Sequence, residues 1–485
     1  MAERRLESKV ASGIAWSFSE KLLTMLIQMV VSIIVARQLM PEDFGIMAIL
    51  TFFTSVSLAI VDSGFSQTLI RKNNPSDEEY KSVLRFNIAV SLILYAILIF
   101  VTPYIADYYG HSEIAKVAPV LFLVLPINSL CVVQTVMFTK EFRFALLSKI
   151  VFFASAISGI VAVVMALMGC GIWSLVAQRL LMMGIKAAAF WVIRRWRTDA
   201  RFSIGAIMSM MPFSLRLLAT DLIASIYNNV AQLFIGKMHN TAMLGYYSQA
   251  QKLKDLPVIS TTQAVQGVTY PALSELNEDG EKFGEGYLRI VRMLGFVLFP
   301  MMLGFVAIAD DMFMLLLGEK WMPTVPYFEI LALSGLFHPL AVVGYNVLKV
   351  RSDGRIIVRL EVVKRVIMTL VLCYTIPRGV MAVAWGMTLM AVVEFLLNSV
   401  VALRISTLPK MRFIGALLPS FVIAVIMYFA ILFMAPYIAN WGVALRLICE
   451  ILCGGALYLC MAFMFRLKAL KEGIQLLGSM LTKSV

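Results

Sequence analysis

Residues 86–106 read FNIAVSLILYAILIFVTPYIA, which is 21 consecutive residues without a charged side chain. An α-helix rises about 1.5 Å per residue, so about 20 apolar residues cross the hydrocarbon core of a bilayer. Because such runs are continuous, rather than short and alternating as in a membrane β-barrel, they predict an all-α membrane protein. Fourteen transmembrane helices are predicted, at residues 11–36, 44–69, 83–106, 114–138, 146–168, 171–193, 206–235, 242–270, 286–308, 324–348, 357–376, 379–403, 413–435 and 442–465.

The composition of the 485-residue chain favours the same class. Hydrophobic residues make up 60% and charged residues 15% of the chain, and its mean hydropathy is +0.86. Soluble domains are about 45–50% apolar and about 25% charged. A soluble core cannot bury so much apolar surface, which excludes a soluble enzyme, a disordered regulator and a fibrous protein. The six cysteines form no CxxC pair and the three histidines are far apart, so neither a metal nor another cofactor is expected.

The net charge of +13 has a topological explanation. The N-terminus and every second predicted loop, through to the C-terminus, together hold 24 lysines and arginines, whereas the alternate loops hold 5. Lysine and arginine collect in the cytoplasmic loops of membrane proteins. The asymmetry therefore predicts an even number of helices with both termini in the cytoplasm, and the basic charge requires no nucleic-acid partner.

Two segments about 200 residues apart resemble each other. ARQLMPEDFG at residues 36–45 follows the first predicted helix, and GKMHNTAMLG at residues 236–245 follows the seventh. The sequence IAD recurs at 105–107 and 308–310, after the third and ninth helices. Six helices per repeat is an even number, so the two repeats have the same orientation in the membrane. We therefore expect two parallel six-helix lobes, residues 1–200 and 201–410, with a cavity between them and a C-terminal helix pair within 411–485.

Polar side chains run along one side of the first two helices of each predicted lobe, at 11–36, 44–69, 206–235 and 242–270. Charged and polar groups at membrane depth are costly and commonly face a water-filled cavity. These helices therefore predict a substrate-binding cavity, with no catalytic residues. The candidate substrate-binding residues are Glu20, Lys21, Asp62, Arg216, Asp221, Ser225, Asn228, Asn229, Lys252 and Gln263.

Structural roles remain open for several of these residues. Polar side chains can tie helices together by hydrogen bonds, Lys21 can pair with Glu20, and Lys252 can neutralise Asp255. Arg216 lies off the polar side of its helix and can snorkel toward the cytoplasm. The charged residues early in 357–376 are expected to snorkel or pair. Three single acids in apolar runs lack an evident partner and are candidate proton or sodium sites: Glu329, Glu394 and Glu450.

Several turn motifs resemble one known family. In the first half they are Gly13, Trp16, Ala36-Arg37, Leu39, Pro41, Asp43-Phe44-Gly45, Asp62, Gly64 and Ile70. In the second half they are Ile235-Gly236, Leu244-Gly245-Tyr246-Tyr247, Ala250, Leu253, Pro257, Pro271, Leu273-Ser274, Gly318, Trp321 and Leu331-Ala332-Leu333. The chain resembles the polysaccharide transporters of the multidrug/oligosaccharidyl-lipid/polysaccharide exporter superfamily, which are flippases of the O-antigen, capsule and colanic-acid type. It departs from them at residues 237–240, where relatives usually carry a more apolar or small run.

The resemblance implies a specific function. The substrate would be an undecaprenyl-pyrophosphate-linked oligosaccharide, moved across the bacterial inner membrane by alternating access during surface polysaccharide synthesis. Membrane lipids would be partners, as would a polysaccharide polymerase and glycosyltransferases. Cations in the cavity would offset the desolvation of the pyrophosphate.

Two other functions are weighed against this one. An ion-coupled exporter of small organic cations, similar to the multidrug and toxic-compound extrusion proteins, is disfavoured by the extra helix pair and by cations such as Lys252. A membrane glycosyltransferase, polymerase or ligase needs a sizeable loop with catalytic residues, and the predicted loops are too short. We therefore expect a transporter rather than an enzyme.

Overall fold

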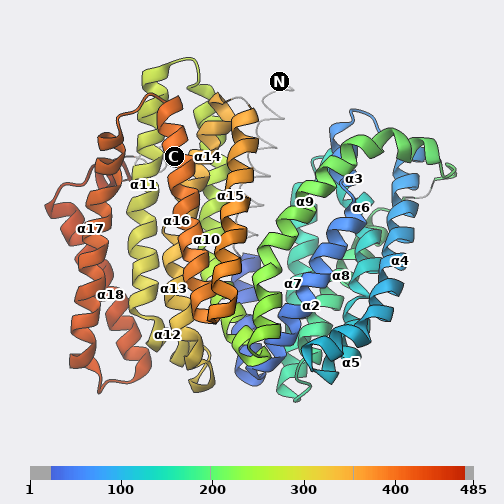
Figure 1. Ribbon diagram of the computed structural model, residues 1–485, viewed down its shortest axis with the longest axis horizontal. Helices are drawn as coiled ribbons and strands as arrows, with labels where there is room; N and C mark the ends of the chain where they lie inside the picture. Colours follow the sequence, from blue (N-terminus) through green and yellow to red (C-terminus); the bar gives the residue numbers. More distant parts are fainter. Residues whose placement is uncertain (1–22, 197, 353, 474, 476–485) are drawn as a thin grey trace. The chain divides into compact units, whose positions relative to one another are not determined.

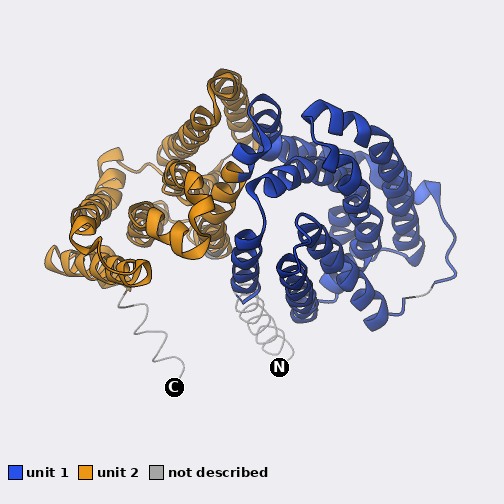
Figure 2. Ribbon diagram, turned by 90° about the horizontal axis from the view of Figure 1, so that it is seen from below, with its two compact units in different colours: residues 1–245 blue, residues 246–485 orange. Residues whose placement is uncertain are grey.

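The computed structural model describes residues 23–196, 198–352, 354–473 and 475. Every regular element in these ranges is a helix, and the prediction of an all-α protein is confirmed (Figure 1). The chain forms two compact units, residues 1–245 and 246–485, coloured separately in Figure 2. The predicted lobe boundaries at 200 and 410 remain a prediction.

The first unit contains a helix at Leu23–Gln38 and eight further helices. The pairs α2 and α9, α4 and α6, and α7 and α8 make the most extensive contacts in this unit. Their bounds are α2 Pro41–Asp62, α3 Phe65–Arg71, α4 Asp77–Tyr109, α5 Ser112–Leu121, α6 Val124–Lys140, α7 Phe144–Leu167, α8 Trp173–Ile193 and α9 Ile204–Met238. A buried apolar cluster that includes Phe65, Val136 and Met210 joins α3, α6 and α9.

The second unit begins within α10, Thr241–Glu275, whose first five residues precede the boundary between the units. In this unit α11 packs on α17, and α16 packs on α13, α14 and α15. The bounds are α11 Gly280–Ala307, α12 Ala309–Leu316, η1 Glu319–Thr324, α13 Val325–Gly335, α14 His338–Arg351, α15 Gly354–Thr375, η2 Ile376–Arg378, α16 Val380–Ile405, α17 Lys410–Met434, η3 Ala435–Ile438 and α18 Val443–Met464.

Eleven helical segments of the described chain are long and apolar enough to cross a membrane, so the chain is a multi-pass membrane protein. They coincide with eleven of the fourteen predicted spans. The described parts of the other three predicted spans are helical, and residues 11–22 of the first lie outside the described residues. The described part of that span lies in the helix Leu23–Gln38, and α10 and α15 are too polar to count by composition. Their crossing of the membrane remains a prediction.

Three predicted spans are interrupted rather than continuous. The span predicted at 44–69 is divided into α2 and α3 because Ser63 and Gly64 adopt left-handed backbone angles, with φ of 50° and 71°. The spans at 114–138 and 324–348 are divided near Leu123 and Phe337. Pro126 and Pro339 lie in the first turn of the helix that follows each break, where a missing N–H is tolerated.

The two repeated segments contact each other reciprocally within the first unit. A Cβ atom added at Gly45 would collide with the carbonyl oxygen of Thr241, and one added at Gly245 would collide with that of Pro41. An offset of 200 residues converts one contact into the other. The sequence repeat is thus accompanied by a two-fold arrangement of backbone contacts, which only glycine permits at these positions.

Candidate functional site

The middle of α9 carries a polar face that is not buried. Asp221 and Asn228 are exposed and Ser225 and Asn229 are half-buried, and at 100° per residue these four side chains share one side of the helix. The buried residues of α9 are confined to its ends: Ile207, Met210, Ser214, Ala231, Ile235 and Gly236. A helix of membrane-spanning length and composition therefore presents polar groups, near its centre, to something other than packed protein.

The opposite side of α9 is exposed and apolar. Ile223, Ile226 and Phe234 are 49%, 40% and 44% exposed, and their positions place them away from Asp221 around the helix. Apolar side chains in contact with lipid are favourable, whereas a carboxylate and amides in lipid are strongly unfavourable. The two sides of α9 are consequently suited to two different environments, lipid and water.

The turn after α2, together with α3, contacts the first half of α9. The Thr68 and Ser214 hydroxyl groups are 2.8 Å apart, and a Cβ atom at Gly64 would lie 2.6 Å from the Ser214 carbonyl oxygen. This close approach brings Asp62 onto the helix pair that also carries Asp221. Asp62 accepts a 2.6 Å hydrogen bond from the Ser66 hydroxyl. The structure thus unites the predicted residues of α2 and α9 on one pair of packed helices.

The α10 residues lie in the second unit. Lys252 and Gln263 are exposed. Asp255 pairs with the Lys254 ammonium group at 2.6 Å, and the Lys254 side chain is only 14% exposed. Lys254 is therefore an ion-pair partner of Asp255, the role that the sequence left open for Lys252.

The remaining predicted residues lie elsewhere. Arg216 is exposed on α9, off the polar face. Glu20 and Lys21 fall outside the described residues. The structure therefore gathers Asp62, Asp221, Ser225, Asn228 and Asn229 in the first unit and places Lys252 and Gln263 in the second. Their role in binding remains a prediction.

A charged cluster in the second unit corrects one expectation. Glu394 has partners: its carboxylate lies 3.6 Å from the His338 ring nitrogen Nδ1 and 3.7 Å from the Lys364 ammonium group. Lys364 also donates a 2.8 Å hydrogen bond to Glu361, which lies 3.9 Å from Arg365. Of the charged residues early in 357–376, expected to snorkel or pair, Glu361, Lys364 and Arg365 pair. The expectation that Glu394 is a single acid is wrong.

Sequence reasoning missed the cluster because its members lie on three helices. The spacing of Glu361 and Lys364 within α15 was a visible signal, since residues three apart on a helix are neighbours. His338 stands at the break between α13 and α14, and Glu394 lies near the middle of α16. Only the packing of α16 against α14 and α15 brings them together.

Glu450 behaves differently from Glu394. It is 4% exposed on α18, and its Oε2 atom has no hydrogen-bond partner among the residues that the structure describes. One turn earlier, Arg446 pairs with Asp311 of α12. Burying an ionised carboxylate with an unsatisfied oxygen costs free energy, and protonation reduces that cost. This is consistent with the hypothesis, made from the sequence, of a proton site at Glu450.

These features define a multi-pass membrane protein with polar helix faces at membrane depth. Residues 34–326 match the sequence model of a protein family whose description is "Polysaccharide biosynthesis protein". The chain therefore belongs to the polysaccharide biosynthesis protein family. The resemblance seen in the turn motifs is confirmed.

Individual proteins show how far the similarity extends. The chain is 23% identical to the teichuronic acid biosynthesis protein TuaB of Bacillus subtilis over 400 residues, 81% of this chain and 82% of the relative. It is 25% identical to the succinoglycan biosynthesis transport protein ExoT of Rhizobium meliloti over 339 residues, 68% of this chain and 67% of the relative. The solved structure of the lipid II flippase MurJ, in an inward closed conformation, superposes with a TM-score of 0.73 at 14% identity, covering 92% of this chain and 98% of that chain. The last similarity establishes the fold.

Proposed function

We propose that this protein is a flippase that moves an undecaprenyl-pyrophosphate-linked oligosaccharide across the bacterial cytoplasmic membrane by alternating access, with both termini in the cytoplasm. A polysaccharide polymerase and the glycosyltransferases that build the repeat unit would act after and before it. The names of the relatives support this assignment, because one is a transport protein of succinoglycan synthesis and the similar solved structure is a lipid II flippase.

The observation that carries the proposal is the unburied polar face of α9. Asp221 and Asn228 are exposed near the centre of a helix long enough to span the bilayer. Water is the environment that such groups tolerate at this depth, so the face is suited to an aqueous path. Amide and hydroxyl groups are also the partners that sugar hydroxyls require.

The negative charge of the proposed substrate requires cationic side chains in the binding site. A pyrophosphate that leaves water needs nearby cations, because an unpaired buried charge costs several kcal/mol. Lys252, exposed on α10, is the proposed cation, and Lys21 and Arg216 are further candidates. Glu20, Asp62, Ser225, Asn229 and Gln263 complete the proposed set of contacts. The lipid tail remains in the bilayer while the headgroup crosses.

The proposal is tested by deleting the gene and analysing lipid-linked intermediates. Accumulation of complete repeat units on the cytoplasmic side supports a flippase. Truncated units, or complete units that reach the periplasm without being polymerised, indicate an enzyme instead. Normal polysaccharide together with greater sensitivity to organic cations indicates the multidrug exporter.

A matched pair of variants then tests the cation. Lys252→Ala in the complemented strain should abolish surface polysaccharide while leaving the amount of protein in the membrane unchanged. Lys116→Ala is the control, because Lys116 is an exposed lysine on α5 outside the proposed path. Normal export by Lys252→Ala would remove Lys252 from the binding site.

A further inference from the structure

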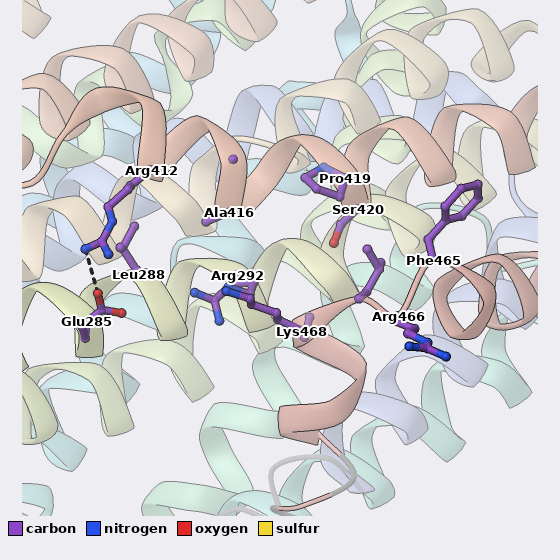
Figure 3. A pocket seen from close by; sticks show the side chains of 13 residues that line it. Glu285, Leu288, Arg292, Arg412, Ala416, Pro419, Ser420, Phe465, Arg466 and Lys468 are labelled. Atoms are coloured by element: carbon purple, nitrogen blue, oxygen red, sulfur yellow. Dashed lines mark hydrogen bonds and ion pairs between the residues drawn. The ribbon is translucent and has the colours of Figure 1, made fainter.

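A basic pocket of about 370 Å³ lies in the second unit, and no residue of α10 lines it. Its walls are the first half of α11, the first half of α17 and the segment that follows α18. Four of the lining side chains are cations and one is an acid: Arg292, Arg412, Arg466, Lys468 and Glu285. In Figure 3, Arg292 and Lys468 lie between Arg412 on one side and Arg466 on the other.

The acids near the pocket neutralise only part of this charge. Glu285 pairs with Arg412 at 2.9 Å, an ion pair in which both side chains are more than half exposed. Glu472 pairs with Arg292 and lies 4.0 Å from Arg289. Arg466 and Lys468 have no ion-pair partner among the described residues. The pocket thus keeps two cations available for an anion.

The backbone at Arg466 is unusual for a residue with a side chain. Its φ of 48° is left-handed, and the Arg466 and Leu467 amides donate to the carbonyl oxygens of Phe463 and Ala462 at 3.0 Å. This is the bonding pattern of a helix C-terminus that normally ends in glycine, because a side chain is strained there. Glycine can therefore replace Arg466 without loss of this backbone conformation.

The surroundings of the pocket indicate a lipid rather than a soluble anion. Apolar side chains share its lining with the cations, among them Leu288, Ala416 and Pro419. Large apolar side chains on α17 and α18 beside it are exposed, as expected of a surface in contact with acyl chains: Met411 is 77%, Phe463 75% and Met464 67% exposed. A pocket lined by both cations and apolar side chains, next to exposed apolar helix faces, suits the phosphate and glycerol of a phospholipid.

The position of Arg292 inside a helix distinguishes this pocket from a cluster of lysines and arginines in a cytoplasmic loop. Cytoplasmic loops collect lysine and arginine without any ligand, which is sufficient to explain Arg412, Arg466 and Lys468 by sequence alone. Arg292 is the thirteenth residue of α11, well inside a helix of membrane-spanning length, and its side chain is 17% exposed. The cations therefore extend from the end of the helices toward the depth of a lipid phosphate.

We propose that this pocket binds the phosphate headgroup of an anionic membrane phospholipid, held by Arg466 and Lys468 beside the Arg292–Glu472 pair, with the glycerol against the apolar lining residues. Basic pockets between transmembrane helices on the cytoplasmic side are suited to such headgroups, and arginine forms paired hydrogen bonds to phosphate. The site goes beyond the proposed transport function, since its ligand is a lipid of the membrane and not the cargo.

The test measures binding of short-chain phosphatidylglycerol to the full-length protein in neutral detergent by titration calorimetry, with short-chain phosphatidylcholine as the uncharged comparison. The double variant Arg466→Gly, Lys468→Gln should raise the Kd for phosphatidylglycerol about tenfold or more, since it removes the two cations, unpaired within the described chain, that would bind the phosphate. Glycine suits the left-handed position, so the thermal midpoint of the variant should not fall. Lys471→Gln is the matched control, because it removes an exposed lysine of the same segment that does not line the pocket.

Three results would overturn the proposal. The first is an unchanged Kd in the double variant. The second is competition by glycerol 1-phosphate as effective as that by phosphatidylglycerol, which would identify a soluble anion. The third is binding of farnesyl diphosphate at least tenfold tighter than phosphatidylglycerol, which would make the pocket part of the transport path. Because the readout is binding and not export, failure here leaves the proposed function untouched.

Discussion

The middle of α9 and the cluster around Lys364 both carry charged side chains, but the charge is exposed in the first region and paired in the second. Lys364 is 6% exposed and its charge is matched by Glu361 and Glu394. Asp221 is exposed and has no ion-pair partner among the described residues. A charge at membrane depth is tolerated either by an internal partner or by water. We therefore expect the paired cluster to stabilise the second unit, and we propose that the exposed face of α9 binds a ligand.

The largest expected effect concerns the paired cluster. Lys364→Ala removes the ammonium group that pairs with both Glu361 and Glu394, and leaves these acids only their contacts with Arg365 and His338. Breaking a buried ion pair costs about 3–5 kcal/mol, and the partial exposure of both acids reduces this to about 3 kcal/mol here. The measurement is the free energy of unfolding in detergent.

Arg359→Ala is the control for this prediction, because Arg359 is exposed on the same helix. Its stability should change by less than about 0.5 kcal/mol. If Lys364→Ala were as stable as Arg359→Ala, the cluster would not be a structural element and the contrast with α9 would disappear.

The next effect concerns the attachment of α9 to α2. Gly64→Ala introduces a Cβ atom 2.6 Å from the Ser214 carbonyl oxygen and 2.8 Å from the Leu217 Cβ atom, at a φ of 71°. Left-handed strain and overpacking together should cost about 2 kcal/mol or more. The measurement is the thermal midpoint of unfolding of full-length Gly64→Ala, compared with that of the unmodified protein.

Gly110→Ala isolates the packing contribution. Gly110 has a φ of 72° with nothing within 4 Å of the added atom, so this variant should lose only about 1 kcal/mol from strain. Equal losses at Gly64 and Gly110 would show that the close approach of α9 contributes nothing to stability.

The smallest effect on stability is expected on the open face of α9. Asn228→Ala removes an exposed amide that has no described packing contact to lose, so unfolding should change by less than about 0.5 kcal/mol. Export of polysaccharide should nevertheless fall, because the amide is proposed to bind sugar hydroxyls. If Asn228→Ala lowered the free energy of unfolding by about 2 kcal/mol while export stayed normal, Asn228 would be a structural residue, as proposed for Lys364, and not a binding residue.

Sequence patterns predicted much of this fold for a physical reason. Spanning helices must satisfy their own backbone hydrogen bonds in lipid, so length and hydropathy decide where they lie. The polar side of α9 was equally visible, because the period of a helix places Asp221, Ser225 and Asn228 together. The reciprocal contacts of Gly45 and Gly245 follow the sequence repeat.

Other features depend on contacts that no local pattern encodes. The pairing of Glu394 with His338 and Lys364 requires the register of three helices. The break at Ser63 and Gly64 requires a left-handed turn that hydropathy does not reveal. The basic pocket joins Arg292 and Lys468, which are 176 residues apart in the chain. These interactions are tertiary, and one sequence specifies them only through the packing of the whole unit.

Water access to Ser225 tests the central claim most directly. In a chain whose six cysteines are replaced, Ser225→Cys should react with a charged, membrane-impermeant maleimide in at least one transport state. Ser155→Cys, buried at 3% exposure, and Ile160→Cys, 64% exposed on the lipid-facing side of α7, should both stay unlabelled. Complete protection of Ser225→Cys in every state, equal to that of Ile160→Cys, would show that the polar face of α9 meets no water and would contradict the account.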